Sequence, residues 1–247
     1  MDHQEILEKW PLMGAFWLIE DPCFFKNNEL QCEKAAKKAT SKDTELLADF
    51  AKASVADVRW KVAENPNTPV EVLEALASDG HSVVRMCVAE NLNTPAKALE
   101  ALASDRHGIV RMDVACNPNT TTKVLEALAS DEGSNVRMCV AKHPSTPVEI
   151  LVKLADDPSE DVRKNVGHNP NTTVEILVKL ADDPSQRVRE NVGKNPNTPS
   201  KVLERLADSQ DDYVRQGVAC NPSTPVKVLE CLTNDKDGMV CIEAKKH

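Results

Sequence analysis

The chain has 247 residues, a formal net charge of −9 and a pI near 5.2. This acidic balance disfavours nucleic-acid binding, because phosphate contacts depend on clustered Lys and Arg. Eight Cys are sparse for a disulfide scaffold of this size, and the most apolar run, residues 11–19, is too short to cross a membrane. We therefore expect a reduced, cytoplasmic protein that does not span a membrane.

The N-terminal segment differs from everything after it. Five of the eight aromatic residues fall in the first 25 positions, at Trp10, Phe16, Trp17, Phe24 and Phe25. The rest of the chain is a repeat array, and the first unit of an array needs a cover. We therefore predict an N-terminal helical cap over residues 1–43 and a single array over residues 44–247.

The array repeats every 26 residues from Val58 to Val240 without insertion or deletion. Full copies begin at Val58, Val84, Val110, Val136, Val162, Val188 and Val214, and a further copy begins at Val240 and stops. A fixed period of this length predicts a solenoid, in which each unit contacts only its neighbours.

Each repeat contains the pattern of two helices. The first buries two Val four positions apart, such as Val162 and Val166, and ends before a Pro, so that Asn65 and its equivalents lie outside the helix. The second is predicted to begin with Thr68 as its N-cap and Glu71 reaching back in a capping box. Because these segments are short, we expect one helix of each pair to be partly 3₁₀.

The repeat motif carries a resemblance. Residues 58–79 read Val-Arg-x-x-Val-Ala-x-Asn-Pro-Asn-Thr-Pro and then Val-Leu-Glu-x-Leu-Ala-x-Asp, which resembles the leucine-rich repeat variant family. The first part is also similar to HEAT-like repeats, but the Asn-Pro-Asn-Thr-Pro loop favours the former. The resemblance implies an all-α, right-handed superhelical solenoid of about seven to eight two-helix repeats, α plus short α or 3₁₀, behind the N-terminal cap.

An Arg occupies the second position of every full repeat: Arg59, Arg85, Arg111, Arg137, Arg163, Arg189 and Arg215. Such a column forms either a structural ladder, with each guanidinium bound to Asp side chains or helix ends of adjacent units, or a stripe that binds anions. We favour the ladder, because each Arg adjoins a core Val and follows an Asp by six residues in most repeats.

The residues that follow the Arg column form what we call the Arg-adjacent row. It reads Trp60, Met86, Met112 and Met138, then Lys164, Glu190 and Gln216, and the next column adds Cys87 and Cys139. Met-rich surfaces adapt to the side chains of a partner, so the apolar half of the row, with both Cys, is a candidate partner-binding site. The alternative is that these Met side chains fill the seams between successive repeats.

The family resemblance also implies a cofactor alternative. Members of the leucine-rich repeat variant family can carry an N-terminal iron–sulfur domain, but this segment supplies only Cys23 and Cys32. A cluster normally takes four thiolates, so we predict no cofactor and keep the cluster as an alternative.

We find no Gly-rich phosphate loop, nucleophile elbow or His–carboxylate grouping outside positions that the repeat dictates. We therefore predict a non-enzymatic scaffold that binds a protein partner through an extended solenoid surface. The alternatives are an iron–sulfur or redox protein with an N-terminal cluster and a nucleic-acid-binding solenoid that uses the Arg column. The oligomeric state stays open.

Overall fold

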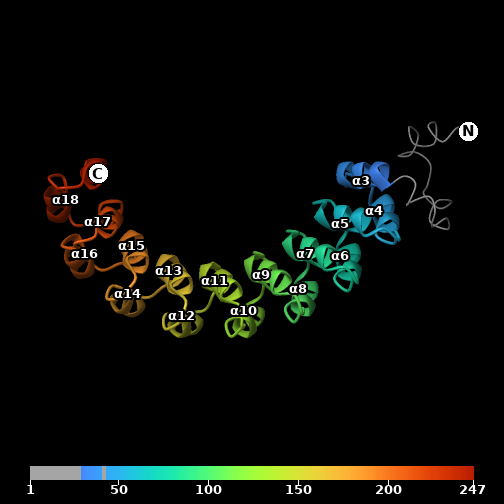
Figure 1. The fold of residues 1–247 in the computed structure, drawn as a ribbon, viewed down its shortest axis with the longest axis horizontal. Helices are drawn as coiled ribbons and strands as arrows, with labels where there is room; N and C mark the ends of the chain where they lie inside the picture. The colour runs from blue at the N-terminus through green and yellow to red at the C-terminus, as the bar shows by residue number, and fades with distance from the viewer. Residues whose placement is uncertain (1–28, 41–42) are drawn as a thin grey trace, which may run out of the picture. The chain divides into compact units, whose positions relative to one another are not determined.

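The computed structural model describes residues 29–40 and 43–247, and Figure 1 shows their helices. All regular structure in this part of the chain is α-helical. The 3₁₀ helix that we expected is not found there. Hydrogen bonds of 3₁₀ spacing occur at helix ends, such as Val72 N–H to Pro69 O at the start of a second helix and Asp79 N–H to Leu76 O after its end. Bonds between them, such as Ala77 N–H to Leu73 O, have α-helical spacing. None of the described helices is long and apolar enough to cross a bilayer.

The helices alternate between the two types predicted for each repeat. The first helices are α5 (Ala56–Glu64), α7 (Ser82–Glu90), α9 (Gly108–Cys116), α11 (Ser134–Lys142), α13 (Glu160–His168), α15 (Gln186–Lys194), α17 (Asp212–Ala219) and α19 (Gly238–Ala244). The second helices are α6 (Val70–Leu76), α8 (Ala96–Leu102), α10 (Thr122–Leu128), α12 (Val148–Leu154), α14 (Val174–Leu180), α16 (Ser200–Ala207) and α18 (Val226–Leu232).

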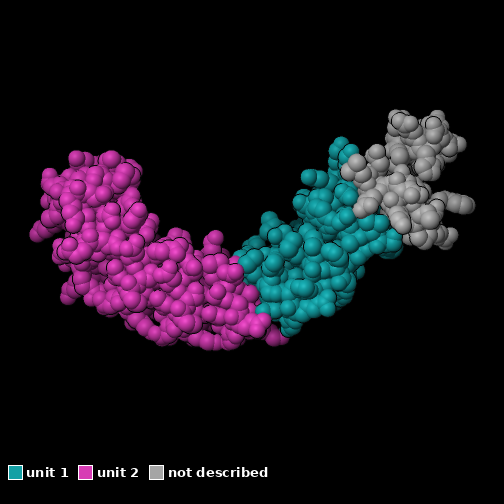
Figure 2. All heavy atoms as spheres, viewed as in Figure 1, with its two compact units in different colours: residues 1–120 teal, residues 121–247 magenta. Residues whose placement is uncertain are grey.

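The chain divides into two compact units, which Figure 2 distinguishes by colour. Unit 1 is Met1–Thr120 and unit 2 is Thr121–His247. Within each unit the first helices form one layer and the second helices the other (Figure 1). Successive first helices pack closely on one another, whereas successive second helices touch less, so the first-helix layer is the more continuous surface of each unit.

The end of the predicted cap and the start of the predicted array together form a helix pair at the start of unit 1. Helix α3 (Glu29–Lys38) and helix α4 (Thr44–Phe50) pack against each other and against α5. Cys32 and Ala36 on α3 are buried at the spacing of the two core Val of a first helix, and Leu47 and Phe50 are buried on α4. The described part of the predicted cap therefore resembles a repeat in its packing. Residues 1–28 lie outside the described residues.

Buried Asn side chains join successive repeats. The Nδ2 group of Asn195 donates to Gly167 O at 2.8 Å and Asn169 O at 3.0 Å, both in the preceding repeat, while its Oδ1 accepts from Asn197 N–H at 2.9 Å. The same pair of inter-repeat bonds is made by Asn65, Asn91, Asn117, Asn169 and Asn221. Because each amide satisfies carbonyls that a terminating helix leaves unpaired, the Asn column fixes the spacing between repeats.

The predicted capping box is wrong. The N-cap of α6 is Pro69, and the Thr68 side chain makes no capping bond to that helix. Thr68 is instead buried, and its hydroxyl donates to Val62 O at 2.5 Å, at the end of α5. The equivalent Thr side chains make the same bond in the later repeats: Thr94, Thr120, Thr146, Thr172, Thr198 and Thr224. The Thr column thus closes the first helix and does not open the second.

Candidate functional site

Most members of the Arg column are held by carboxylates within the chain. In unit 2, Arg163 donates through Nε and Nη2 to both oxygens of Asp183, at 2.7 and 3.1 Å, and through Nη1 to Asp157 O at 2.7 Å. Bidentate bonds of this kind join Arg59 to Asp79, Arg85 to Asp105, Arg137 to Asp157 and Arg215 to Asp235. Each links a first helix to the turn that starts the next one.

The two remaining members of the column, Arg189 and Arg111, also donate to backbone carbonyls of the chain. A Ser, Ser209, stands where the partner of Arg189 would be, and Arg189 donates to the carbonyls of Asp183 and Pro184 at 2.6 and 3.0 Å. Arg111 donates to Asp105 O at 2.8 Å. All seven guanidinium groups therefore bind groups of the chain, and the geometry favours the structural interpretation of the column over an anion stripe.

These ion pairs also shift the pKa values of the Asp and Arg side chains at the junctions between repeats. A hydrogen bond from Arg215 and a backbone N–H bond from Asp237 hold the pKa of Asp235 below its ordinary value, and the same contact raises the pKa of Arg215. Arg215 is 4% exposed, so its charge is almost wholly enclosed by these partners. A phosphate that approached it would have to displace a bidentate carboxylate.

The Arg-adjacent row lies on the outer side of the first-helix layer. In unit 1, Trp60, Met86 and Met112 are half-buried. Apolar side chains stand one helical turn before the two Met: Val83 is half-buried and Ile109 is 60% exposed. We call Val83, Met86, Ile109 and Met112 the apolar strip of unit 1. Two adjacent helices, α7 and α9, carry it.

The two Cys that we assigned to this site are not at the surface. Cys87 and Cys139 are each 5% exposed, so neither is available to contact a partner, and that part of the prediction is corrected. For Cys87 the reason is its column, which faces the preceding first helix of the same unit. Gly217 of unit 2 shows how closely this column approaches its neighbour, because a Cβ built on it would lie 2.5 Å from Glu190 O of α15. Burial raises the pKa of Cys87 to about 11, which keeps this thiol protonated.

Asp113, which no sequence motif indicates as a site residue, occupies that inward-facing column on α9. Its side chain is 8% exposed, and its Oδ2 has no hydrogen-bond partner. Burial, together with the charge of Glu90 on α7, raises the pKa of Asp113 to about 7. At equivalent positions Asn165 and Asn191 donate to the carbonyl four residues back, at 2.7 and 2.8 Å, which an ionised carboxylate cannot do.

Trp60, the first residue of the Arg-adjacent row, is surrounded by charged side chains that pair with one another or with its ring. Its Nε1 donates to Asp57 Oδ1 at 3.0 Å, and Lys61 Nζ lies 3.5 Å from the centroid of its ring. Lys61 also pairs with Glu64 at 2.9 Å. The charges around Trp60 are thus mutually neutralised, unlike those at Glu90 and Asp113.

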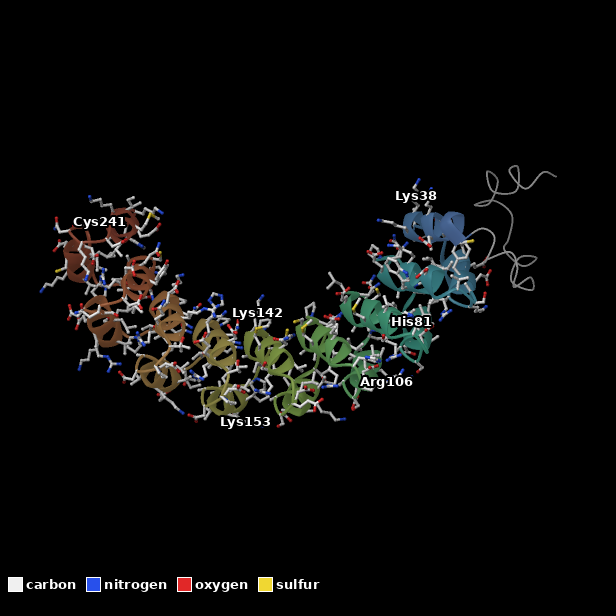
Figure 3. All side chains as sticks on the ribbon, viewed as in Figure 1. Lys38, His81, Arg106, Lys142, Lys153 and Cys241 are labelled. Carbon is white, nitrogen blue, oxygen red and sulfur yellow. The ribbon has the colours of Figure 1, made fainter. Side chains whose placement is uncertain are left out.

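The first-helix layer of unit 2 has a different character. Met138 is half-buried, and the positions that follow in its row, from Lys164 onward, are polar. Basic side chains stand at the ends of successive first helices, at Lys142, His168 and Lys194. Figure 3 shows Lys142 on the side of this layer that faces away from Lys153 of α12. Lys194 pairs with Glu190 at 2.5 Å, so part of this charge is balanced locally.

Two other surfaces of unit 2 are weaker candidates for a binding site. The second helices expose Val148, Val152, Val174 and Val178, each between 38% and 51%. A hollow of about 440 Å³ lies beside the Asp-Pro turns between α12 and α15, lined by residues that include Asp156, Arg163 and Lys179. Its charged groups are already paired, Arg163 with Asp183 and Lys179 with Asp156.

The predicted metal ligands do not meet in the described structure. Cys23 lies outside the described residues, and Cys32 is buried on α3, where burial and then the charge of Glu33 raise its pKa to about 11. Among residues 29–40 and 43–247, no group of three or more His, Cys, Asp or Glu side chains is placed to hold a metal ion.

Comparison with known proteins identifies the type of repeat. Residues 56–81 match the family model described as leucine rich repeat variant, and the matched segment spans one repeat. The predicted resemblance is confirmed. A solved leucine-rich repeat variant, described as having a novel repetitive protein structural motif, is similar to the chain with a TM-score of 0.61 and 24% identity, over 98% of this chain and 94% of that one. This likeness shows the fold: the chain is an all-α repeat solenoid.

More distant structures are also repeat-like or engineered. An engineered protein matches with a TM-score of 0.44 and 18% identity over 98% of this chain and 87% of that chain. A designed armadillo repeat protein matches with a TM-score of 0.26 and 16% identity over 99% and 97%. A comparison with curated proteins finds no match.

Proposed function

We propose that this leucine-rich-repeat-variant solenoid is a non-enzymatic scaffold that binds a protein partner through the first-helix face of unit 1. The observation that carries the proposal is the apolar strip of Val83, Met86, Ile109 and Met112 on adjacent helices. Soluble proteins rarely leave contiguous apolar side chains open unless they contact another molecule, and Met suits a surface that adapts to its partner.

The Arg, Asn and Thr columns support the proposal because their side chains are already used in hydrogen bonds that hold the fold. The Arg, Asn and Thr columns are engaged in bonds within and between repeats, so their conservation of type along the chain is explained by folding. The Arg-adjacent row makes no such ladder: it is apolar in unit 1 and turns polar in unit 2 after Met138. Residues that are not needed for the stacking of repeats can differ from one repeat to the next, and such residues can form the partner-binding surface of a solenoid.

Site-specific photo-crosslinking tests this proposal. A photoreactive phenylalanine derivative replaces Ile109 in one variant and Val178, on the second-helix layer, in another. We expect a defined protein from the source cells to crosslink from position 109 and not from position 178. Equal crosslinking from both positions, or none from position 109, contradicts the proposal.

Binding of the purified partner supplies the quantitative half of the test. The variant M86Q/M112Q keeps side-chain size but makes the strip polar, and V152T/V178T is a near-isosteric control on the opposite layer. We expect the first to weaken binding by about tenfold or more and the second to leave it within about twofold. Wild-type affinity in a folded M86Q/M112Q variant contradicts the assignment of the surface.

A further inference from the structure

The seam between α7 and α9 contains two carboxyl groups that nothing in the described structure neutralises. Asp113 is more than nine-tenths buried, its Oδ2 has no partner, and it faces α7. Glu90, at the end of α7, is exposed and makes no ion pair. Buried carboxylates are usually paired or hydrogen-bonded, so these two carboxyl groups give the seam an acidic character that the chain does not compensate.

Two cationic side chains near this seam, Arg85 and Lys61, are already paired with other groups of the chain. Arg85 is bound to Asp105 and to Asp79 O, and Lys61 pairs with Glu64 beside Trp60. The charge of Glu90 acts on Asp113 and on Cys87, and in both cases it raises the pKa of the neighbour. The middle of the unit 1 face is thus an acidic seam beneath the apolar strip, without a cation of its own among these side chains.

The side chain that fits such a seam has a long apolar stem and a positive end. Met86 and Met112 offer flexible apolar walls to the stem, the exposed Glu90 offers an acceptor to the ammonium or guanidinium end, and the buried Asp113 adds negative charge beneath it when ionised. A bare metal ion fits less well, because the described residues provide no group of three ligands there. An acidic or phosphorylated segment would add repulsion to two unpaired carboxyls.

We infer that the partner segment is basic, and that one of its Lys or Arg side chains docks between α7 and α9, with its stem on Met86 and Met112 and its charged end at Glu90 and Asp113. The inference rests on the proposed function and names the chemistry of its partner. Because Oδ2 of Asp113 is enclosed, the charged end makes its direct bond with the exposed Glu90 carboxylate, and an ionised Asp113 adds its negative charge to the attraction.

Three short fluorescein-labelled peptides test the inference on the full chain by fluorescence anisotropy. They share the repeating pattern X-Leu-Ala, with X being Lys, Gln or Glu, so that only charge changes. The protein variants are D113N/E90Q, which removes both seam carboxyls, and E71Q/E126Q, which removes two exposed carboxyls from the second helices. The titration is run at about pH 8.5, where Asp113, with its pKa of about 7, is ionised, so that both variants change net charge nearly equally. Asn is already accommodated in the Asp113 column at Asn165 and Asn191.

We expect the Lys peptide to bind wild type more tightly than the Gln peptide, and the Glu peptide to bind least. D113N/E90Q should weaken the Lys peptide by about tenfold or more, and E71Q/E126Q by less than about twofold. Equal weakening by the two variants would mean that the peptide responds only to net charge, and it overturns the inference. Failure of the Lys peptide to bind overturns it as well.

The outcomes separate this inference from the proposed function. If the Gln and Lys peptides bind equally and M86Q/M112Q abolishes both, the apolar strip binds partners without a basic requirement, so only the inference fails. If crosslinking from position 109 also yields no partner, the proposed function fails with it.

Discussion

Removal of one guanidinium from the Arg column should destabilise the fold strongly. Arg137 donates to both carboxylate oxygens of Asp157 at 2.7 and 3.0 Å, and to Asp131 O and Glu132 O at 2.8 and 3.1 Å. The substitution R137M keeps the stem but leaves the Asp157 side chain, 5% exposed, with the Ser159 N–H as its remaining hydrogen-bond donor. Breaking a buried pair from one side costs about 3–5 kcal/mol, a large part of the stability of a domain.

The pH dependence of this loss follows from Asp157. Burial alone would raise its pKa, but hydrogen bonds from Arg137 and Ser159 outweigh burial and hold it below its ordinary value. In the wild type the resulting stability is present above the unfolded pKa of about 3.9 and is lost as pH falls through the lower folded pKa. In R137M burial acts nearly unopposed, so the deficit should be smaller near about pH 5 than near about pH 8.

Urea unfolding followed by circular dichroism at both pH values measures the effect. The matched control is R187M in the same unit, because Arg187 pairs with Glu160 and Asp161 at 3.3 and 3.2 Å while half exposed. That pair should contribute about 0–1 kcal/mol. If R137M unfolds at the wild-type urea midpoint, or if R187M loses as much as R137M, the ladder interpretation of the Arg column is refuted.

Three further predictions concern packing and buried polar groups. N195A removes both inter-repeat bonds of a 2%-exposed amide and should cost about 2–4 kcal/mol in urea unfolding, whereas a change below about 0.5 kcal/mol would contradict the role of the Asn column. G217A should lower the thermal midpoint because its Cβ would meet Glu190 O at 2.5 Å, while G238A, with open space, should not; similar midpoints for both would argue against the close approach. For Asp113, whose pKa is raised to about 7, the unfolded chain ionises from about pH 4 while the folded chain keeps its proton, so wild-type stability should fall between about pH 4 and pH 7. D113N should remove that fall and exceed wild type by up to about 4 kcal/mol near about pH 8, and parallel pH profiles of the two proteins in urea unfolding would contradict this assignment.

The repeat made much of the architecture predictable. The two Val of each first helix and the Asn before Pro were expected in the core and at the helix end, and Val162, Val166 and Asn169 lie there. The function of Thr68 was not predictable from local pattern, because a Thr before Pro suits an N-cap and only its burial reveals the bond to Val62 O. One-dimensional patterns do not distinguish a side chain that opens one helix from one that closes another.

The sequence pattern left two positions open for Met86 and Met112, on the outer surface or in the seams between repeats, and both side chains are half-buried on the first-helix face. Cys87 was placed beside them although its column turns toward the preceding helix. Asp113 was missed because its column is variable in sequence. A signal was present in the Asn165 and Asn191 of later repeats, because an ionised Asp cannot donate the hydrogen bond that these amides make at the equivalent position.

The most direct measurement of the central claim is a methyl NMR titration of the full chain labelled with ¹³C at its methionine methyl groups, with the partner identified by crosslinking from position 109. The methyl signals are assigned by Met→Leu variants. We predict that the signals of Met86 and Met112 shift or broaden as the complex forms, while that of Met239, 52% exposed on α19, stays in place. Unchanged Met86 and Met112 signals in a saturated complex would show that the partner binds elsewhere.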